Sequence, residues 1–281
     1  WRNTQRTKEL PRQEESQAEK GRNNMRIMFL SHLPENPKAK ERYAKVQAQL
    51  NDYASPGTEV ELCFPDDYPG AKLSLDLAAR NEVPGIYHML QTPAIIRKVV
   101  WAEKNGYDAL VQSNTFDPGV EAARNTVRIP VVGVLRATLH TATILANSIV
   151  IIVPLEDHIA YTWQIIRSYG MEGFVKDIAA VGLYEEGAEK RVREIFARAA
   201  EVMRATVKKT AAGCIIPLGA AVFPLLVSPR DLEREVGVPV LNTKAIGIRF
   251  AETCVQLGMA QSPSTYPLAQ LRYEDFTALA R

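Results

Sequence analysis

The sequence predicts an α/β protein made of two doubly wound units, each with a mainly parallel sheet of four strands. Three observations predict this fold class. Apolar runs of strand length alternate with amphipathic helical stretches, which is typical of parallel βαβ units. The chain has 281 residues, of which 46% are hydrophobic, and this length suits two modest domains. A single eight-stranded barrel is disfavoured because the strands are unevenly spaced and a long turn-rich segment follows the second one.

The folded chain is expected to begin near Met25. Within residues 1–24 the only apolar side chains beyond alanine are Trp1 and Leu10, and no periodicity is present. We therefore predict a disordered leader over 1–24.

Eight apolar runs follow and are predicted as strands. Their ranges are 27–33, 59–64, 109–113, 131–135, 148–154, 178–183, 214–218 and 238–241. Amphipathic helices are expected between most of them, and the clearest covers 185–209. Its apolar stripe consists of Val192, Ile195, Phe196, Ala199 and Met203.

Charge and composition exclude several classes of partner. The chain has 34 Lys and Arg against 32 Asp and Glu, a net charge of +2, which disfavours nucleic acid or an anionic membrane surface as the main partner. No apolar run reaches the roughly 18–20 residues of a membrane helix, so we predict a cytoplasmic protein. Cys63, Cys214 and Cys254 are widely spaced and predict neither a disulfide framework nor a zinc site. Signatures of nucleotide and metal cofactors are also absent, so no cofactor is expected.

Ligands of open α/β sheets bind beyond the carboxyl ends of the strands. The residues at these ends are therefore the candidate site. They are Ser31, His32, Ser113, Asn114, Thr115, Arg136, His140, Gly219, Ala220, Ala221, Asn242, Thr243 and Lys244.

Three of these candidates have two interpretations each. Lys244 is either a desolvated base or carboxylate anchor, or an exposed residue at a helix N-terminus. Arg136 is either a bidentate clamp for a substrate carboxylate or part of a surface salt bridge. His140 lies four residues after Arg136 on the same helical face, where it is either an acid or base or a surface residue.

The segment from Asp108 to Gly119 is the most informative part of the chain. It reads as a strand followed by small polar residues and then by Asp-Pro-Gly at a helix start, where free backbone amides can bind an anion. Asp117 is interpreted as the N-cap of that helix, and Pro118 as its first-turn proline.

Several short motifs, in this order, resemble the aspartate/glutamate/hydantoin racemase superfamily. Asn114-Thr-Phe-Asp-Pro-Gly-Val-Glu-Ala-Ala-Arg124 with Ile129-Pro-Val-Val-Gly133 resembles its first active-site turn. Cys214-Ile-Ile-Pro-Leu-Gly-Ala220 resembles the strand that delivers its second catalytic cysteine. Gly237-Val-Pro-Val-Leu-Asn242 resembles the next strand, and Ser264-Thr-Tyr-Pro267 the tail.

The resemblance implies two pseudo-symmetric domains with the active site in the cleft between them. Residues 25–134 plus 236–281 would form the first domain and 135–235 the second, and the last strand would share the first sheet. It also implies a small carboxylated or cyclic amide substrate and proton transfer between two cysteines, without cofactor or metal.

This chain departs from that pattern at both cysteine positions. The first holds Ser113 or Asn114, depending on the alignment, and the second holds Ala220. Cys214 does not replace the second thiol, because it lies near the start of its strand, roughly 20 Å from the site.

We therefore expect a cofactor-independent enzyme that acts by non-thiol enolate, carbanion or oxyanion-stabilised chemistry. Ser113, Asn114 and Thr115 would be oxyanion donors, and Lys244 or His140 the acid or base. The remaining candidates, from Ser31 and His32 to Asn242 and Thr243, would contact substrate. The alternatives are a ring-opening hydrolase or a decarboxylase on the same scaffold, and a non-catalytic protein that binds a small molecule. The chain could also form a homo-oligomer.

Overall fold

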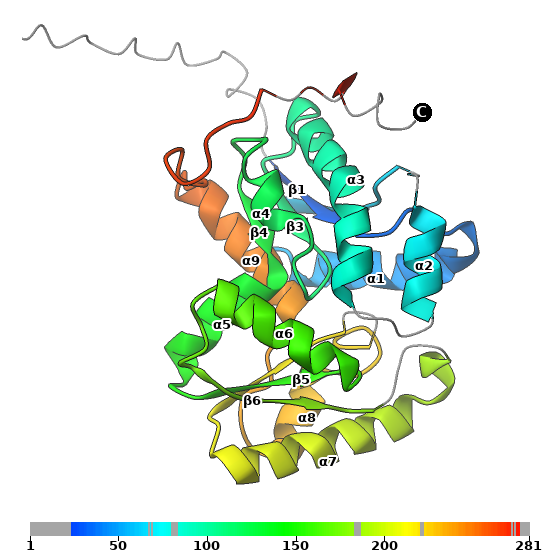
Figure 1. The fold of residues 1–281 in the computed structure, drawn as a ribbon, viewed down its shortest axis with the longest axis vertical. Helices are drawn as coiled ribbons and strands as arrows, with labels where there is room; N and C mark the ends of the chain where they lie inside the picture. Colours follow the sequence, from blue (N-terminus) through cyan, green and yellow to red (C-terminus); the bar gives the residue numbers. More distant parts are fainter. Residues whose placement is uncertain are drawn as a thin grey trace, which may run out of the picture.

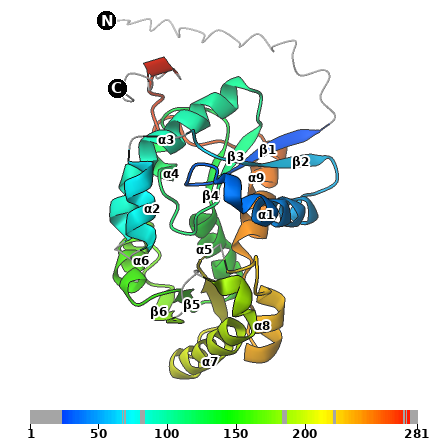
Figure 2. The same ribbon diagram turned by 90° about the vertical axis from the view of Figure 1, so that its right-hand side faces the viewer.

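The computed structural model describes residues 24–66, 68, 70–79, 84–182, 187–219, 222–270, 272 and 274–275. They form two sheet-centred units, one above the other in Figure 1, with α5 (Val134–Leu145) between them in both views (Figures 1 and 2). The predicted α/β class with parallel sheets is confirmed. The predicted leader lies outside the described residues, except for Asn24.

The first sheet has the four predicted strands, all parallel, in the order β2-β1-β3-β4. They are β1 (Met25–Leu30), β2 (Thr58–Cys63), β3 (Ala109–Gln112) and β4 (Val131–Gly133). Because β3 is buried on both faces, its sequence is a continuous apolar run up to Gln112.

Helices cover both faces of the first sheet. The short helix η2 (Pro37–Ala39) leads into α1 (Lys40–Tyr53), which shares one face with α9 (Thr243–Gln256), where Leu50 and Ile248 pack with Val111. The other face carries α3 (Pro84–Lys104) and α4 (Val120–Ala123). α2 (Ala71–Ala79) packs outside α3.

The second sheet has three parallel strands in the order β6-β5-β7. They are β5 (Ile149–Val153), β6 (Val175–Ala180) and β7 (Cys214–Pro217). One face packs on α5 and α6 (Asp157–Ser168). The other packs on α7 (Val192–Thr210) and α8 (Pro229–Val236), and η3 (Ala188–Lys190) precedes α7.

The last predicted strand is wrong in two respects. Residues 238–241 form only one bridge, between Val240 and Ile215 of β7, so they join the second sheet and not the first. Pro239 has no N–H to extend the ladder, and the Val240 N–H donates to the Glu233 carboxylate at 3.2 Å. The helix α9 does return to the first sheet. The division of the chain into 25–134 plus 236–281 and 135–235 remains a proposal.

Two other predicted elements are shifted. β6 begins three residues before the predicted run 178–183, because this edge strand starts with the polar pair Lys176 and Asp177. α7 begins at Val192, later than predicted, after the short helix η3. In the part of the chain that the structure describes, we find no helix with the length and apolar character needed to span a membrane.

Candidate active site

The turn after β3 is fixed by backbone and side-chain hydrogen bonds. The Ser113 N–H donates to the Leu30 carbonyl at 2.9 Å, which extends the pairing with β1 by one residue. The Asn114 N–H donates to Gln112 Oε1 at 2.7 Å, and Asn114 Oδ1 accepts from the Phe116 N–H at 2.9 Å. Ser113 and Asn114 are half-buried, so their side chains sit at the sheet end with some access to solvent.

Thr115 connects this turn to the second sheet. Its Oγ1 accepts a hydrogen bond from the Gly219 N–H at 3.1 Å, although the two residues are 104 positions apart. Gly219 has a φ of +97°, and a Cβ there would lie 2.9 Å from Cγ of Pro154, so glycine is required. The carboxyl ends of β3 and β7 therefore meet. Ala220 and Ala221, the next two predicted site residues, lie outside the described residues.

Ser31 and His32 follow β1 beside this turn. The Ser31 N–H donates to the Cys63 carbonyl at 2.8 Å, and its hydroxyl accepts from the Leu33 N–H at 3.2 Å. The ring of His32 stands perpendicular to that of His88, with 6.4 Å between centroids. Burial, with a smaller contribution from Arg42, lowers the pKa of His32 to about 4, so its imidazole is neutral at pH 7.

Asn242, Thr243 and Lys244 open α9. The Asn242 side chain caps the helix by accepting from the Ala245 N–H at 3.1 Å. Lys244 is 3% exposed, so the interpretation of this lysine as a surface residue is wrong.

The packing of α9 shows where its first turn lies relative to β3. Gly247 lies so close to Val111 and Val134 that a Cβ would be 3.1 Å and 2.8 Å from their methyl carbons. Thr243 and Lys244, one turn earlier on the same helical face, therefore lie toward the carboxyl end of β3.

Buried polar atoms gather at this end of the first sheet. Nδ1 of His32, Nε2 of Gln112 and Oγ1 of Thr243 have no hydrogen-bond partner among the described residues. Leaving such a group unsatisfied costs about 1–3 kcal/mol, and water or a ligand normally satisfies it. The sequence did not point to Gln112, because a single polar residue at the end of an apolar run gives no sign of a polar site.

A family model described as Asp/Glu/hydantoin racemase matches residues 36–251. The chain belongs to the Asp/Glu/hydantoin racemase family. A hydantoin racemase of Pseudomonas sp. (strain NS671) is 30% identical over 173 residues, which are 62% of this chain and 68% of that protein. A hydantoin racemase of Rhizobium meliloti is 24% identical over 192 residues, 67% of this chain and 77% of that protein.

Solved structures show the same fold. The allantoin racemase from Pseudomonas fluorescens has a TM-score of 0.75 at 19% identity, covering 88% of this chain and 98% of that one. The allantoin racemase from Klebsiella pneumoniae has a TM-score of 0.74 at 20% identity, covering 89% and 95%. At these identities the likeness establishes the fold alone.

The three cysteines of this Asp/Glu/hydantoin racemase family member are all buried. Desolvation raises the pKa of each thiol, that of Cys214 to about 11. Cys214 starts β7, as the sequence predicted, while the contact with Thr115 is made beyond the other end of that strand. The chemistry of these thiols is therefore that of neutral core residues.

In the described structure, no hydrogen bond or ion pair joins the side chains of Arg136 and His140 to residues 113–115. The Arg136 guanidinium pairs with Glu121 at 2.9 Å and stacks over the Tyr169 ring, which matches the salt-bridge interpretation. His140 is exposed on α5. Their spacing correctly predicted one helical face, but it could not show which way that face is turned.

Asp117 does not cap α4, and this prediction was wrong. Gly119, in the left-handed region, occupies the N-cap position of α4. The buried Asp117 carboxylate instead caps α5, accepting from the N–H groups of Leu135 and Arg136 at 2.9 Å each, and from the Tyr169 hydroxyl at 3.0 Å. The partner helix begins 17 residues later in the chain, so local sequence cannot reveal it.

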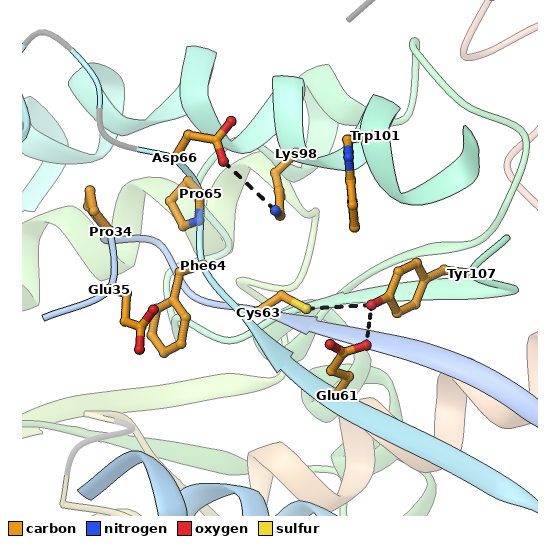
Figure 3. A pocket seen from close by; sticks show the side chains of 10 residues that line it. All are labelled: Pro34, Glu35, Glu61, Cys63, Phe64, Pro65, Asp66, Lys98, Trp101 and Tyr107. Carbon is orange, nitrogen blue, oxygen red and sulfur yellow. Dashed lines mark hydrogen bonds and ion pairs between the residues drawn. The ribbon is translucent and has the colours of Figure 1, made fainter. Parts of the chain in front are cut away.

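A cavity of about 450 Å³ lies elsewhere, beside the outer strand β2 (Figure 3). Five of its polar side chains interact with one another. The Tyr107 hydroxyl donates to Glu61 and lies 3.7 Å from Sγ of Cys63, while the Lys98 ammonium pairs with Asp66 at 3.9 Å. None of the predicted site residues lines this cavity. Across the described ranges, no three His, Cys, Asp or Glu side chains are grouped so as to hold a metal ion.

Proposed function

We propose that this chain is an isomerase that moves a proton at a carbon atom of a small carboxylated or cyclic amide, hydantoin-like, substrate. It would do so without a cofactor and without thiols. Family membership and the hydantoin racemase relatives support the reaction class. The observation that carries the proposal is the bond between Thr115 and Gly219, because it joins the ends of β3 and β7, where the family pattern expects its two reacting groups.

The turn over 113–115 would stabilise negative charge. Removing a proton next to a carbonyl group moves the C–H electron pair onto the carbonyl oxygen, which becomes an enolate oxygen. The Ser113 hydroxyl, the Asn114 carboxamide and the Thr115 hydroxyl can donate hydrogen bonds to such an oxygen. Since Thr115 Oγ1 already accepts from Gly219, its own hydroxyl proton remains for donation.

Two groups able to transfer protons would flank this turn from opposite faces of the first sheet. His32, with a neutral imidazole, contacts His88 of α3 on one face. Lys244 lies at the start of α9, which covers the other face. A base on one face would take the substrate proton, and the acid on the other would return one, so that configuration at carbon inverts. Lys244 could alternatively bind a substrate carboxylate.

The test is incubation in D2O with hydantoins, allantoin, maleate, substituted malonates and amino acids, followed by proton NMR, mass spectrometry and chiral chromatography. We expect deuterium at the stereogenic carbon of one substrate, together with loss of its enantiomeric excess. Gain of water or loss of CO2 without exchange would overturn the isomerase proposal in favour of a hydrolase or a decarboxylase. Thermal stabilisation by one compound without any reaction would overturn it in favour of a binding protein.

A further inference from the structure

His88 of α3 contacts the candidate site. Its side chain is 3% exposed, and both ring nitrogens have partners. Nε2 lies 3.4 Å from Asn114 Nδ2, and Nδ1 lies 3.2 Å from the Tyr161 hydroxyl. Since Tyr161 belongs to α6, this one imidazole connects the turn after β3 to the second unit.

The direction of these hydrogen bonds follows from the neighbouring bond to Asn114. Asn114 Oδ1 accepts from the Phe116 N–H at 2.9 Å, so the end of the carboxamide that faces His88 is the NH2 group. An NH2 group can only donate, and therefore His88 Nε2 must be the acceptor. A neutral imidazole with a bare Nε2 has its proton on Nδ1, which then donates to Tyr161 Oη.

The surroundings keep His88 neutral. It packs among the rings of Tyr87, Phe116 and Tyr161. Burial, and then the imidazoles of His32 and His158, lower the pKa of His88 to about 2. A protonated His88 would also point an N–H at the NH2 group of Asn114. His88 therefore cannot supply a proton at neutral pH, but it can hold an orientation.

We propose that His88 is a positioning residue whose imidazole, protonated on Nδ1 and accepting at Nε2, holds the Asn114 carboxamide with its second N–H directed at the substrate. This inference rests on the proposed function of the 113–115 turn. Without His88 as the acceptor, only the bond from the Phe116 N–H would hold the carboxamide, which could then rotate and present its oxygen to the developing enolate. Two electron-rich oxygens would then meet at the reacting atoms, and turnover would fall while substrate binding changed little.

A measurement that needs no turnover tests the hydrogen-bond direction. The chain has only four histidines, so long-range 1H–15N spectra of the full-length protein can assign each ring, with His88→Gln identifying the His88 signals. We expect His88 to carry its proton on Nδ1. In Asn114→Asp, a carboxylate replaces the NH2 group, and the proton should move to Nε2. A proton on Nε2 in the unsubstituted protein, or no change in Asn114→Asp, would overturn the proposal.

Kinetics of the exchange reaction test the positioning role. His88→Phe keeps a ring but removes the acceptor, and should lower kcat by about 10- to 100-fold with KM nearly unchanged. His88→Gln places an amide oxygen near the position of Nε2 and should recover most of the loss. Equal losses in both variants would mean that His88 only packs, and so would no loss in His88→Phe.

Two further readouts make the kinetic comparison decisive. The melting temperatures of both His88 variants should agree, so that a difference in kcat does not reflect unfolding. Tyr87→Phe is the matched control, because the Tyr87 ring packs against His88 with 4.5 Å between centroids, and we expect its kcat to be unchanged. If no substrate shows exchange, the proposed function fails, while the tautomer of His88 is still decided by NMR.

Discussion

The ammonium group of Lys244 is placed where a positive charge is costly. It lies in the first turn of α9, whose dipole disfavours a cation at that end, and the side chain is 3% exposed. A residue in such a destabilising position often has a functional role.

Substituting Lys244 tests this interpretation. Lys244→Met removes the charge at similar volume, and we expect kcat for proton exchange to fall at least about 100-fold. The melting temperature is measured alongside the rate, so that a loss of kcat is not mistaken for unfolding. Lys208→Met, on the exposed side of α7, is the control and should change neither quantity. An unchanged rate in Lys244→Met would remove this lysine from the proton-transfer groups.

Individual residues of the candidate site could be predicted from the sequence where they directly follow the carboxyl end of a strand. Ser113 and Thr115 follow the end of β3, and Ser31 and His32 follow the end of β1, because all parallel strands of a sheet end at the same edge. His88 was not predictable as a contact of Asn114, since the two are 26 positions apart and share no motif. Which side chains face one another depends on how α3 packs, and no local pattern encodes this.

Among the elements, α5 depends on a cap supplied by another segment. The Asp117 carboxylate binds its first N–H groups, and Gly133 leaves room for it. A Cβ at Gly133 would lie 2.5 Å from the Asp117 carboxyl carbon. Gly133→Ala should therefore displace the carboxylate and lower the free energy of unfolding by about 2 kcal/mol or more. Gly173→Ala, with nothing near the added carbon, should change it by less than about 0.5 kcal/mol in denaturant titrations.

The same cap makes stability depend on pH. Burial raises the pKa of Asp117 from 3.8 to about 6, even though Leu135, Arg136 and Tyr169 donate hydrogen bonds to it. The folded protein therefore binds this proton more tightly than the unfolded chain, and the stabilisation is full below pH 4 and is lost as the pH rises through 6.

Comparison with Asp117→Asn isolates this effect. The unfolding free energy of the unsubstituted protein, minus that of the variant, should grow by on the order of 3 kcal/mol as the pH falls from 7 to 4. Urea titrations at intermediate pH values measure the difference. A difference that shrinks over this range would show that the amide donors outweigh desolvation and keep the carboxylate ionised.

The strands that are buried on both faces were predicted best from the sequence. β3 and β5 are continuous apolar runs and were found at their predicted places. The outer strand β6 has only two buried positions, Val175 and Ile178, and its first half, with the polar pair Lys176 and Asp177, was not predicted. The run 238–241 has strand composition, but Pro239 and the bond from Val240 to Glu233 limit it to one bridge.

At the scale of the whole molecule, hydrogen bonds between distant segments hold the two units together. Thr115 binds Gly219, Asp117 binds Tyr169, and Gln49 of α1 donates to the carbonyls of Pro224 and Leu225 at 3.3 Å each. The first two of these bonds involve the turn after β3. The relative position of the units is thus set next to the proposed site.

Thr115→Val tests this coupling. Valine keeps the shape but can neither accept from the Gly219 N–H nor donate to the enolate oxygen, so kcat should fall by about 100-fold. Thr115→Ser retains the hydroxyl and should lose less than about tenfold. Similar losses in both variants would show that the methyl group, and not the hydrogen bond, aligns the two turns.

The position of α9 has a consequence for biosynthesis. One face of the first sheet is completed by Ile248 and Ala251, yet the strands of that sheet end at Gly133. Because a ribosome makes the chain from its N-terminus, the nascent sheet emerges long before this cover exists. While the whole second unit is translated, the face that α9 later covers stays apolar and exposed to other nascent chains. The period of greatest danger of aggregation therefore ends only when α9 leaves the ribosome.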